Sequence, residues 1–260
     1  MMRFNRISRR RLLSLVLCGT PVLAVADALW LEPRWVIVRR VRLAKGKPVH
    51  RLVHFTDVHH KGDKAYLQSV IAKINALAPD FVCFTGDIVE EKRFLGEALE
   101  CFRAIKSPLY GVPGNHDYWS QADFNVIGAA FASTGGRWLM DKGIRTPGGE
   151  VHVIGVTCSS HMQPRLPIDR SAKNILLMHY PDWVEKLGEQ KLDLILAGHS
   201  HGGQVLIPFY GPVIHTFGAE RHNAGLFQTP SGPLYVNPGI GWFLWPVRFC
   251  CRPEITVIEI

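Results

Sequence analysis

The first half of the chain alternates short apolar runs with segments of helical periodicity. Residues 81–84 are all apolar, as expected of a strand that is buried on both faces. From 65 to 78 the apolar residues recur at helical spacing, and Pro79 ends the pattern. Strand and helix then alternate again, which is typical of a parallel α/β sheet. The expected strands are 36–38 with 41–43, 51–56, 81–85 and 109–112, and the expected helices are 65–78, 94–105 and 122–133.

The second half is richer in strands, and its last third has the pattern of hairpins. One further helix is expected near 181–187. Repeats, low-complexity tracts and linkers are absent from the sequence after residue 35. We therefore predict one α/β (α+β) domain over 32–260, preceded by a separate segment, 1–31. The expected strands are 138–140, 151–157, 174–178, 192–197, 204–208, 225–228, 234–237 and 255–260.

The segment 1–31 has the features of a leader. Three consecutive arginines, at 9–11, precede an apolar stretch that extends from 12 to 31, and 24–26 reads Ala-Val-Ala. This favours a twin-arginine export signal that is cleaved near 26. The same length also suits a retained N-terminal anchor. Export and anchoring both predict a membrane-associated or exported protein, and an anchor also allows a site on the cytoplasmic face of an inner membrane.

Charge excludes one class of partner. The 260 residues carry a net charge of +8, but five of the 30 basic residues precede the first acidic one, Asp27. Without those five, 25 basic residues face 22 acidic ones, a net charge of +3, which suits anionic substrates or membrane surfaces. No nucleic acid is expected, because basic helices, basic stripes with aromatics and zinc-finger spacings are missing from the sequence. The oligomeric state is left open.

Six cysteines occur without any C-x-x-C spacing, so no disulfide scaffold is expected. The adjacent pair Cys250-Cys251 allows two interpretations. The two side chains pack on opposite faces of a strand, or they bind metal or form a vicinal disulfide.

Five polar clusters follow predicted strands in a fixed order. The spacing of Asp57 and His59, like that of His199 and His201, aims both side chains of a pair to the same side of an extended strand end, where two ligands can meet one ion. Asp and His suit Mn, Fe, Co, Ni or Zn, and the absence of cysteine ligands argues against a closed structural zinc site. The glycine before three of these clusters, Gly86, Gly114 or Gly198, lets the backbone turn and approach the ions. The predicted ligands are Asp57, His59, Asp87 as a bridging carboxylate, Asn115 as a neutral oxygen ligand, His179, His199 and His201.

The ordered set D-x-H, G-D, G-N-H-D, H and G-H-x-H resembles that of the calcineurin-like metallophosphoesterases, over about 36–260. The arginine-rich leader, Glu32-Pro33 and the run 251–254 are similar to the bacterial membrane-associated or exported branch. The resemblance implies a four-layer αββα sandwich, in which two mixed sheets are flanked by helices and the metal site lies at strand ends. It implies a phosphodiesterase or pyrophosphatase that uses two divalent ions, Mn or else Fe, Zn, Ni or Co.

The resemblance also implies residue roles. A hydroxide that bridges both ions would attack phosphorus, and His116 would protonate the leaving oxygen. The acid that orients His116 would be Glu90, three residues after the bridging aspartate, and Asp117 is its rival. The first ion would be held by Asp57, His59, Asp87 and His201, and the second by Asp87, Asn115, His179 and His199.

The segment 241–249 contains four aromatic residues and bears on the substrate. It is either a loop that enters a bilayer or lines an acyl groove, with Arg248 and Arg252 at anionic headgroups, or a connection that packs in the core. The expected substrate is a phosphate ester or a lipid-linked pyrophosphate. One alternative by resemblance is a UDP-2,3-diacylglucosamine pyrophosphatase of lipid A synthesis, and another is a silent metal-binding scaffold. A β-lactamase-like hydrolase would need an H-x-H-x-D-H run, which the sequence lacks.

Overall fold

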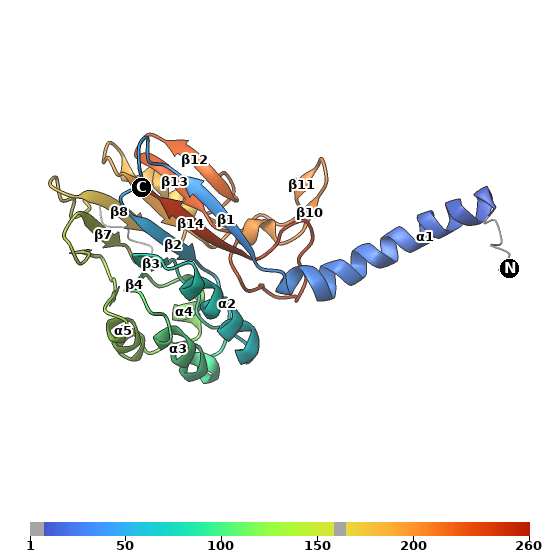
Figure 1. Cartoon of the computed structure of the whole chain (residues 1–260), viewed down its shortest axis with the longest axis horizontal. Coiled ribbons are helices and arrows are strands. Elements are labelled where there is room, and N and C mark those ends of the chain that lie inside the picture. Colours follow the sequence, from blue (N-terminus) through green and yellow to red (C-terminus); the bar gives the residue numbers. More distant parts are fainter. Residues whose placement is uncertain (1–7, 159–164) are drawn as a thin grey trace.

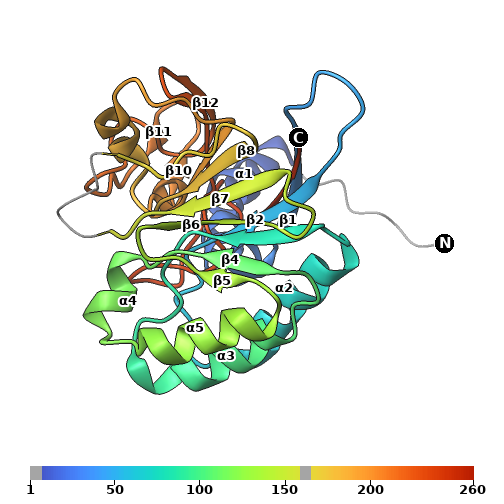
Figure 2. The same cartoon turned by 90° about the vertical axis from the view of Figure 1, so that its left-hand side faces the viewer.

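Two six-stranded mixed sheets pack face to face in the computed structural model, which describes residues 8–158 and 165–260 (Figures 1 and 2). The first sheet contains, in spatial order, β1 (Ile37–Arg42), β14 (Glu254–Glu259), β2 (Arg51–Phe55), β3 (Phe81–Phe84), β4 (Leu109–Gly111) and β5 (Arg137–Trp138). The second contains β12 (Gly225–Thr229), β13 (Gly232–Val236), β9 (Leu194–Ala197), β8 (Lys173–Leu177), β7 (Val151–Gly155) and β6 (Lys142–Arg145).

The strand directions bring the predicted clusters together. In the first sheet β2, β3, β4 and β5 are parallel, and β14 lies antiparallel between β2 and its parallel partner β1. In the second sheet β13, β9, β8 and β7 are parallel. Parallel strands present their carboxyl ends at one edge, so the loops after β2, β3 and β4 share an edge, and those after β8 and β9 share another.

Helices cover the outer face of the first sheet: α2 (Lys64–Ala76), α3 (Leu95–Arg103) and α5 (Phe124–Ser133) (Figure 2). The side chain of Asp63 caps α2 by accepting a hydrogen bond from the backbone N–H of Tyr66 at 3.1 Å. Apolar side chains fill three spaces: between helices and first sheet, between the sheets, and behind the second sheet, where a 3-10 turn (Pro181–Leu187) packs. The predicted sandwich is confirmed.

Local structure differs from the expectation in four places. The segment 181–187 is a 3-10 turn, and the short helix α4 (Asn115–Trp119) was not expected. Strand β6 was also missed, because its sequence, Lys-Gly-Ile-Arg, has one apolar side chain. The expected strand 204–208 is reduced to β10 (Leu206–Ile207), which pairs with β11 (Gly211–Pro212).

Helix α1 (Arg9–Ala26) extends away from the sandwich (Figure 1). A π-helical turn (Asp27–Leu31) and a 3-10 turn (Glu32–Arg34) join it to the body, and the buried carboxylate of Glu32 accepts hydrogen bonds from the backbone N–H groups of Cys250 and Cys251, both at 2.8 Å. Among the described residues, no helix combines the length and the apolar character that crossing a bilayer requires. Residues 1–7, part of the segment predicted to be a leader, lie outside the described part.

The vicinal cysteines form no disulfide with each other. Cys251 is buried and Cys250 is exposed, and neither belongs to a strand. The prediction that they lie on opposite faces of a strand is therefore wrong, because β14 begins only at Glu254.

Candidate metal centre

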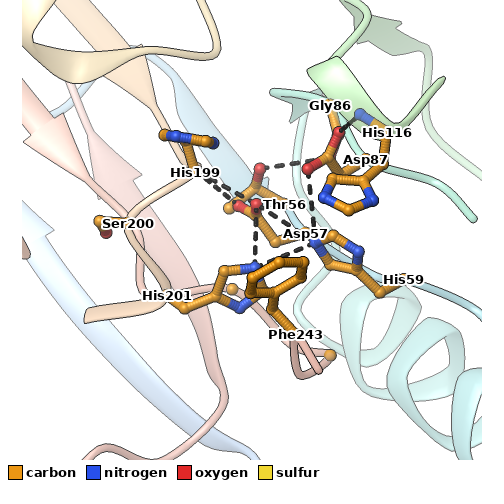
Figure 3. Close-up of polar contacts among 12 residues, drawn as sticks. Thr56, Asp57, His59, Gly86, Asp87, His116, His199, Ser200, His201 and Phe243 are labelled. Atoms are coloured by element: carbon orange, nitrogen blue, oxygen red, sulfur yellow. Dashed lines mark hydrogen bonds and ion pairs between the residues drawn. The ribbon is translucent and has the colours of Figure 1, made fainter. Parts of the chain in front are cut away.

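All seven predicted ligands meet where the two sheets present their strand ends (Figure 3 shows part of this cluster). Their side chains come from loops of both sheets, so the site straddles the sandwich. Asp57 and His59 follow β2, Asp87 follows β3, Asn115 follows β4, His179 follows β8, and His199 and His201 follow β9.

The backbone at these positions is left-handed, not extended as the sequence argument assumed. Positive φ angles occur at Asp57 (51°), His59 (42°), His199 (68°) and His201 (50°). A left-handed residue reverses the chain direction, so the alternation of side chains along a strand no longer holds. Asp57 and His59 still converge, but His199 and His201 diverge into different groups. The strand-end argument was therefore wrong for the second pair.

Two glycines allow this close packing. A Cβ atom added to Gly114 would lie 2.1 Å from Asp87 Oδ1, and one added to Gly198 would lie 2.4 Å from Asp57 Oδ2. Any larger residue at either position would displace a carboxylate of the cluster.

The first group consists of Asp57, His59 and His201, with Asp87 beside it. The Nε2 atoms of His59 and His201 are 3.0 Å apart, and they lie 3.7 and 3.5 Å from Asp57 Oδ1. Asp87 Oδ2 is 3.4 Å from His59 Nε2. Three ligand atoms thus lie close to one another, and a fourth, Asp87 Oδ2, lies beside one of them.

The second group consists of Asp87, His179 and His199, with Asn115 beside it. His179 Nε2 lies 2.9 Å from Asn115 Oδ1, 3.3 Å from Asp87 Oδ2 and 3.1 Å from His199 Nδ1. Asp87 Oδ2 therefore faces both groups. The other oxygen of Asp87, Oδ1, accepts the backbone N–H of His116 at 2.8 Å, which fixes the carboxylate.

These distances fit metal coordination. Bonds of about 2.0–2.2 Å from a divalent ion to N or O ligands place neighbouring ligand atoms about 3–3.5 Å apart. Several ring nitrogens are also held from behind: His59 Nδ1 contacts Glu90, His179 Nδ1 contacts the Thr85 carbonyl, and their Nε2 atoms remain for a metal. The residues present thus fit two adjacent divalent ions that share Asp87.

The electrostatics of the cluster follow from buried carboxylates beside imidazoles. Burial opposes protonation of His59 and His179, but Asp57 and Glu90 at the first ring, and Asp87 at the second, raise both pKa values to about 9. Burial and the neighbouring His179 lower the pKa of His199 to about 4. Burial alone would raise the pKa of Asp87, but His179 and His59 hold it below its ordinary value. The buried carboxylates therefore favour positive charge beside them, from protons or from metal ions.

Glu90 joins this cluster to His116. Its Oε1 lies 2.8 Å from His59 Nδ1, and its Oε2 lies 2.8 Å from His116 Nδ1. Burial would raise the pKa of Glu90, but the hydrogen bonds from both rings hold it below its ordinary value. The His116 ring lies 4.6 Å from the His59 ring, with its Nε2 as the nitrogen that Glu90 leaves unbound.

Asp117, the rival of Glu90, has a different position. Its carboxylate accepts three backbone N–H groups, from Asp87, Ile88 and Gly114, at 2.8–2.9 Å. Burial and the nearby Asp87 raise the pKa of Asp117, which these three hydrogen bonds oppose. Asp117 therefore fastens two ligand loops together and does not contact the His116 ring, in contrast to Glu90.

Aromatic residues that the sequence argument missed line a cleft of about 340 Å³ over the ligands. Trp119, Tyr180 and Phe217 were missed, whereas Phe243 belongs to the segment singled out from the sequence. Sequence spacing could not reveal these three aromatic residues, because they come from separate segments of the chain. The cleft is lined by Asp87, Asn115, His116, Trp119, Tyr180, His199, His201, Thr216, Phe217 and Phe243.

The segment 241–249 is partly packed against the site and partly exposed. Phe243 stacks beside His201 at 6.3 Å, whereas Leu244 and Trp245 are exposed. The prediction that Arg248 meets headgroups is wrong, because its side chain is fully buried. Arg252 lies with its guanidinium 3.9 Å from the ring centre of Trp35.

Comparison with known proteins decides the family. The sequence model described as "Calcineurin-like phosphoesterase" matches residues 50–203, more than half of the chain. The chain belongs to the calcineurin-like phosphoesterases. It is therefore a hydrolase that acts on phosphate esters, in a family that binds a dinuclear divalent metal centre.

Relatives of this phosphoesterase cover almost its whole length. It is 28% identical to the uncharacterized metallophosphoesterase YkuE of Bacillus subtilis, over 90% of this chain and 88% of that protein. It is 28% identical to phosphodiesterase YaeI of Escherichia coli, over 88% and 90%. It is 27% identical to the UDP-2,3-diacylglucosamine pyrophosphatase LpxG of Chlamydia trachomatis, over 93% and 94%.

A solved structure supports the fold. The phosphoesterase superposes on a dimetal phosphatase from Danio rerio with a TM-score of 0.50 and 10% identity, over 82% of this chain and 99% of that one. At this identity the likeness concerns the fold alone.

Proposed function

We propose that the protein is a phosphodiesterase or pyrophosphatase that depends on two divalent ions, Mn²⁺ foremost, and acts on an amphiphilic substrate at a membrane. The observation that carries this proposal is the sharing of Asp87 Oδ2 between two ligand groups, 3.4 Å from His59 and 3.3 Å from His179. Ions held there would neutralise charge on the phosphoryl oxygens and make a water nucleophilic near neutral pH.

The side chains have distinct tasks in this proposal. His116, held through Nδ1 by Glu90, keeps its ring beside the cluster and would donate a proton from Nε2 to the leaving oxygen. Glu90 would keep the orientation of that ring through its contact with Nδ1. Asp117 would hold the loops of Asp87 and Asn115 in register through the backbone.

The cleft and its surroundings support an amphiphilic substrate. The aromatic lining offers apolar contact directly beside the phosphate position. Two of the lining side chains, Trp119 and Phe217, are also exposed, and Leu244 and Trp245, which follow the lining residue Phe243, are exposed as well. Exposed apolar side chains beside the cleft favour contact with a membrane surface.

Hydrolysis of UDP-2,3-diacylglucosamine is a second candidate, favoured by the similarity to LpxG, whose printed name states that activity. A silent scaffold is disfavoured, because all seven ligand side chains are present and lie at coordination distances. For location, we propose export or membrane attachment through the arginine-rich leader. Fractionation followed by N-terminal sequencing tests the location.

Turnover of bis(p-nitrophenyl) phosphate by the purified protein with Mn²⁺ tests the reaction. We expect His201→Ala and Asp87→Asn to lower kcat at least about 1000-fold, because each removes a ligand from an ion that stabilises the transition state. The control is His222→Ala, a histidine that pairs with Asp182 at 2.8 Å outside the cluster. Wild-type turnover in either ligand variant would contradict the proposal.

A further inference from the structure

Arg248 is a buried cation that the proposed chemistry does not use. It lies in the loop 237–253 between β13 and β14, which we call the C-terminal loop. Its side chain is fully buried, and among the described residues no carboxylate lies within 4.0 Å of it. Burial of an unpaired charge is costly, so such a residue persists only where its hydrogen bonds are complete.

The guanidinium binds backbone carbonyls from both ends of the C-terminal loop. Nε donates to Gly241 O at 2.9 Å, and Nη2 donates to Pro238 O at 2.8 Å and to Gly241 O at 2.6 Å. Nη1 donates to Cys251 O at 3.0 Å. Only a planar fork with donors on three nitrogens spans these carbonyls together, since a lysine offers a single nitrogen.

The same loop holds the backbone of two predicted ligands. On one side, Gly241 N donates to Asp57 O at 2.7 Å. On the other, Cys251 Sγ donates to His201 O at 3.2 Å. The C-terminal loop packs tightly against Asp57, because a Cβ added to Gly239 would lie 2.7 Å from Asp57 Cβ. Asp57 and His201 are 144 positions apart in the chain and are joined behind the site through this loop.

We propose that Arg248 is a positioning residue for the first ion: it clamps the C-terminal loop, and the clamped loop sets the spacing of Asp57 and His201. The inference rests on the proposed metal-dependent function and concerns one of the two ion positions. The ligands of the second position, His179 and His199, have no hydrogen bond to the C-terminal loop in the described structure.

The test compares Arg248→Lys and Arg248→Met with Arg252→Met. Arg252 belongs to the same loop but stacks on Trp35, away from the carbonyl cluster, so it is a matched control. Mn²⁺ titration by calorimetry, with native mass spectrometry for stoichiometry, measures each ion separately. Circular dichroism checks folding.

We expect wild type and Arg252→Met to bind two ions alike. Both Arg248 variants should keep one ion and bind the other about 10- to 100-fold more weakly, as when groups behind a ligand are removed. Their kcat on bis(p-nitrophenyl) phosphate should fall at low Mn²⁺ and recover in excess Mn²⁺, with KM unchanged. Arg248→Lys keeps the positive charge. If it still binds the first ion more weakly than wild type, the planar geometry of the guanidinium, and not its charge, is what the loop requires.

Three results would overturn the inference: unchanged affinity at both positions, equal loss at both, or failure of both variants to fold, which marks a purely structural residue. A wild-type protein that binds no metal and hydrolyses no ester would instead refute the proposed function. The two failures are therefore distinguishable.

Discussion

At the scale of single residues, Glu90 contacts two histidines of the candidate site. Its two oxygens contact His59 and His116, each at 2.8 Å, so one carboxylate orients both a predicted ligand and the predicted acid. We expect Glu90→Gln, which keeps the shape and removes the charge, to lower kcat about 10- to 100-fold and to weaken Mn²⁺ binding. Steady-state kinetics and Mn²⁺ titration measure the two effects.

Glu97→Gln is the matched control for that variant. Glu97 Oε1 lies 2.6 Å from His60 Nε2, so these two residues form a second Glu–His pair. His60 directly follows the predicted ligand His59 in the sequence, but the pair does not belong to the ligand cluster. Its activity should stay within about twofold of wild type. Equal losses in the two variants would speak against a special role for Glu90.

His54 makes stability depend on pH. It is wholly buried, with Nε2 2.9 Å from Thr85 Oγ1, and burial lowers its pKa to about 3, compared with 6.5 for an exposed histidine. Below pH 6.5 His54 is therefore protonated in the unfolded chain, whereas it stays neutral in the folded chain. The stabilisation by neutral His54 is complete above pH 6.5 and is lost as the pH falls toward 3.

Between pH 6.5 and pH 5 this loss amounts to about 2 kcal/mol. We expect His54→Gln, whose amide can still pair with Thr85, to lose about 2 kcal/mol less than wild type over that interval. Urea unfolding at both pH values, in EDTA so that metal release does not contribute, measures the difference. Identical pH dependence in the two proteins would refute the role of His54.

Residue type and order predicted which side chains meet at the site, and the family resemblance implied the two groups that the structure shows, but the strand-end spacing did not. Whether His199 and His201 converge or diverge depends on left-handed backbone angles that no side-chain pattern encodes. The buried position of Arg248 could not be predicted from its residue type either. An arginine in a sequence favours the surface, and only the fold reveals the ring of carbonyls that lets it lie inside.

At the scale of elements, the buried strands of the sandwich were predictable because continuous apolar runs are hard to mistake. Strands β2, β3, β8 and β9 lie within or close to the expected ranges. Edge elements were less predictable. Strand β6 pairs on one side only and carries one apolar residue, so its formation depends on β7 and not on its own pattern.

The short helix α4 was missed for a related reason. It contains Asn115, His116 and Asp117, whose polar side chains favour turns over helix interiors. Its first turn is stabilised by the Asp117 carboxylate, which accepts N–H groups of neighbouring loops as well as that of Gly114. Helix formation there depends on tertiary contacts that a local pattern does not contain.

At the scale of the whole molecule, the predicted ligands come from both sheets, which also meet through apolar packing and through hydrogen bonds such as that from the Tyr235 hydroxyl to Glu254. Ions bound by Asp57 and His201, or by Asp87 and His179, would therefore join both halves of the sandwich. We expect saturating Mn²⁺ to add about 4 kcal/mol of stability for each site filled at 1000 times its dissociation constant. Removal with EDTA should lower the Tm by about 10 °C or more.

Scanning calorimetry with EDTA and with Mn²⁺ measures this shift. The variant Asp87→Asn loses the charge of the shared ligand and should show a smaller difference between the two conditions. A Tm that does not respond to EDTA in the wild-type protein would contradict coupling between the sheets and the ions.

Strand β14 has a consequence for how the protein matures. It lies between β1 and β2, so β1 joins the sheet only through β14, whereas β2 also pairs with β3. Asp57 and His59 follow directly from β2 and depend on its docking. We therefore expect the first sheet, which supports the loop of Asp57 and His59, to be complete only after β14 has entered it.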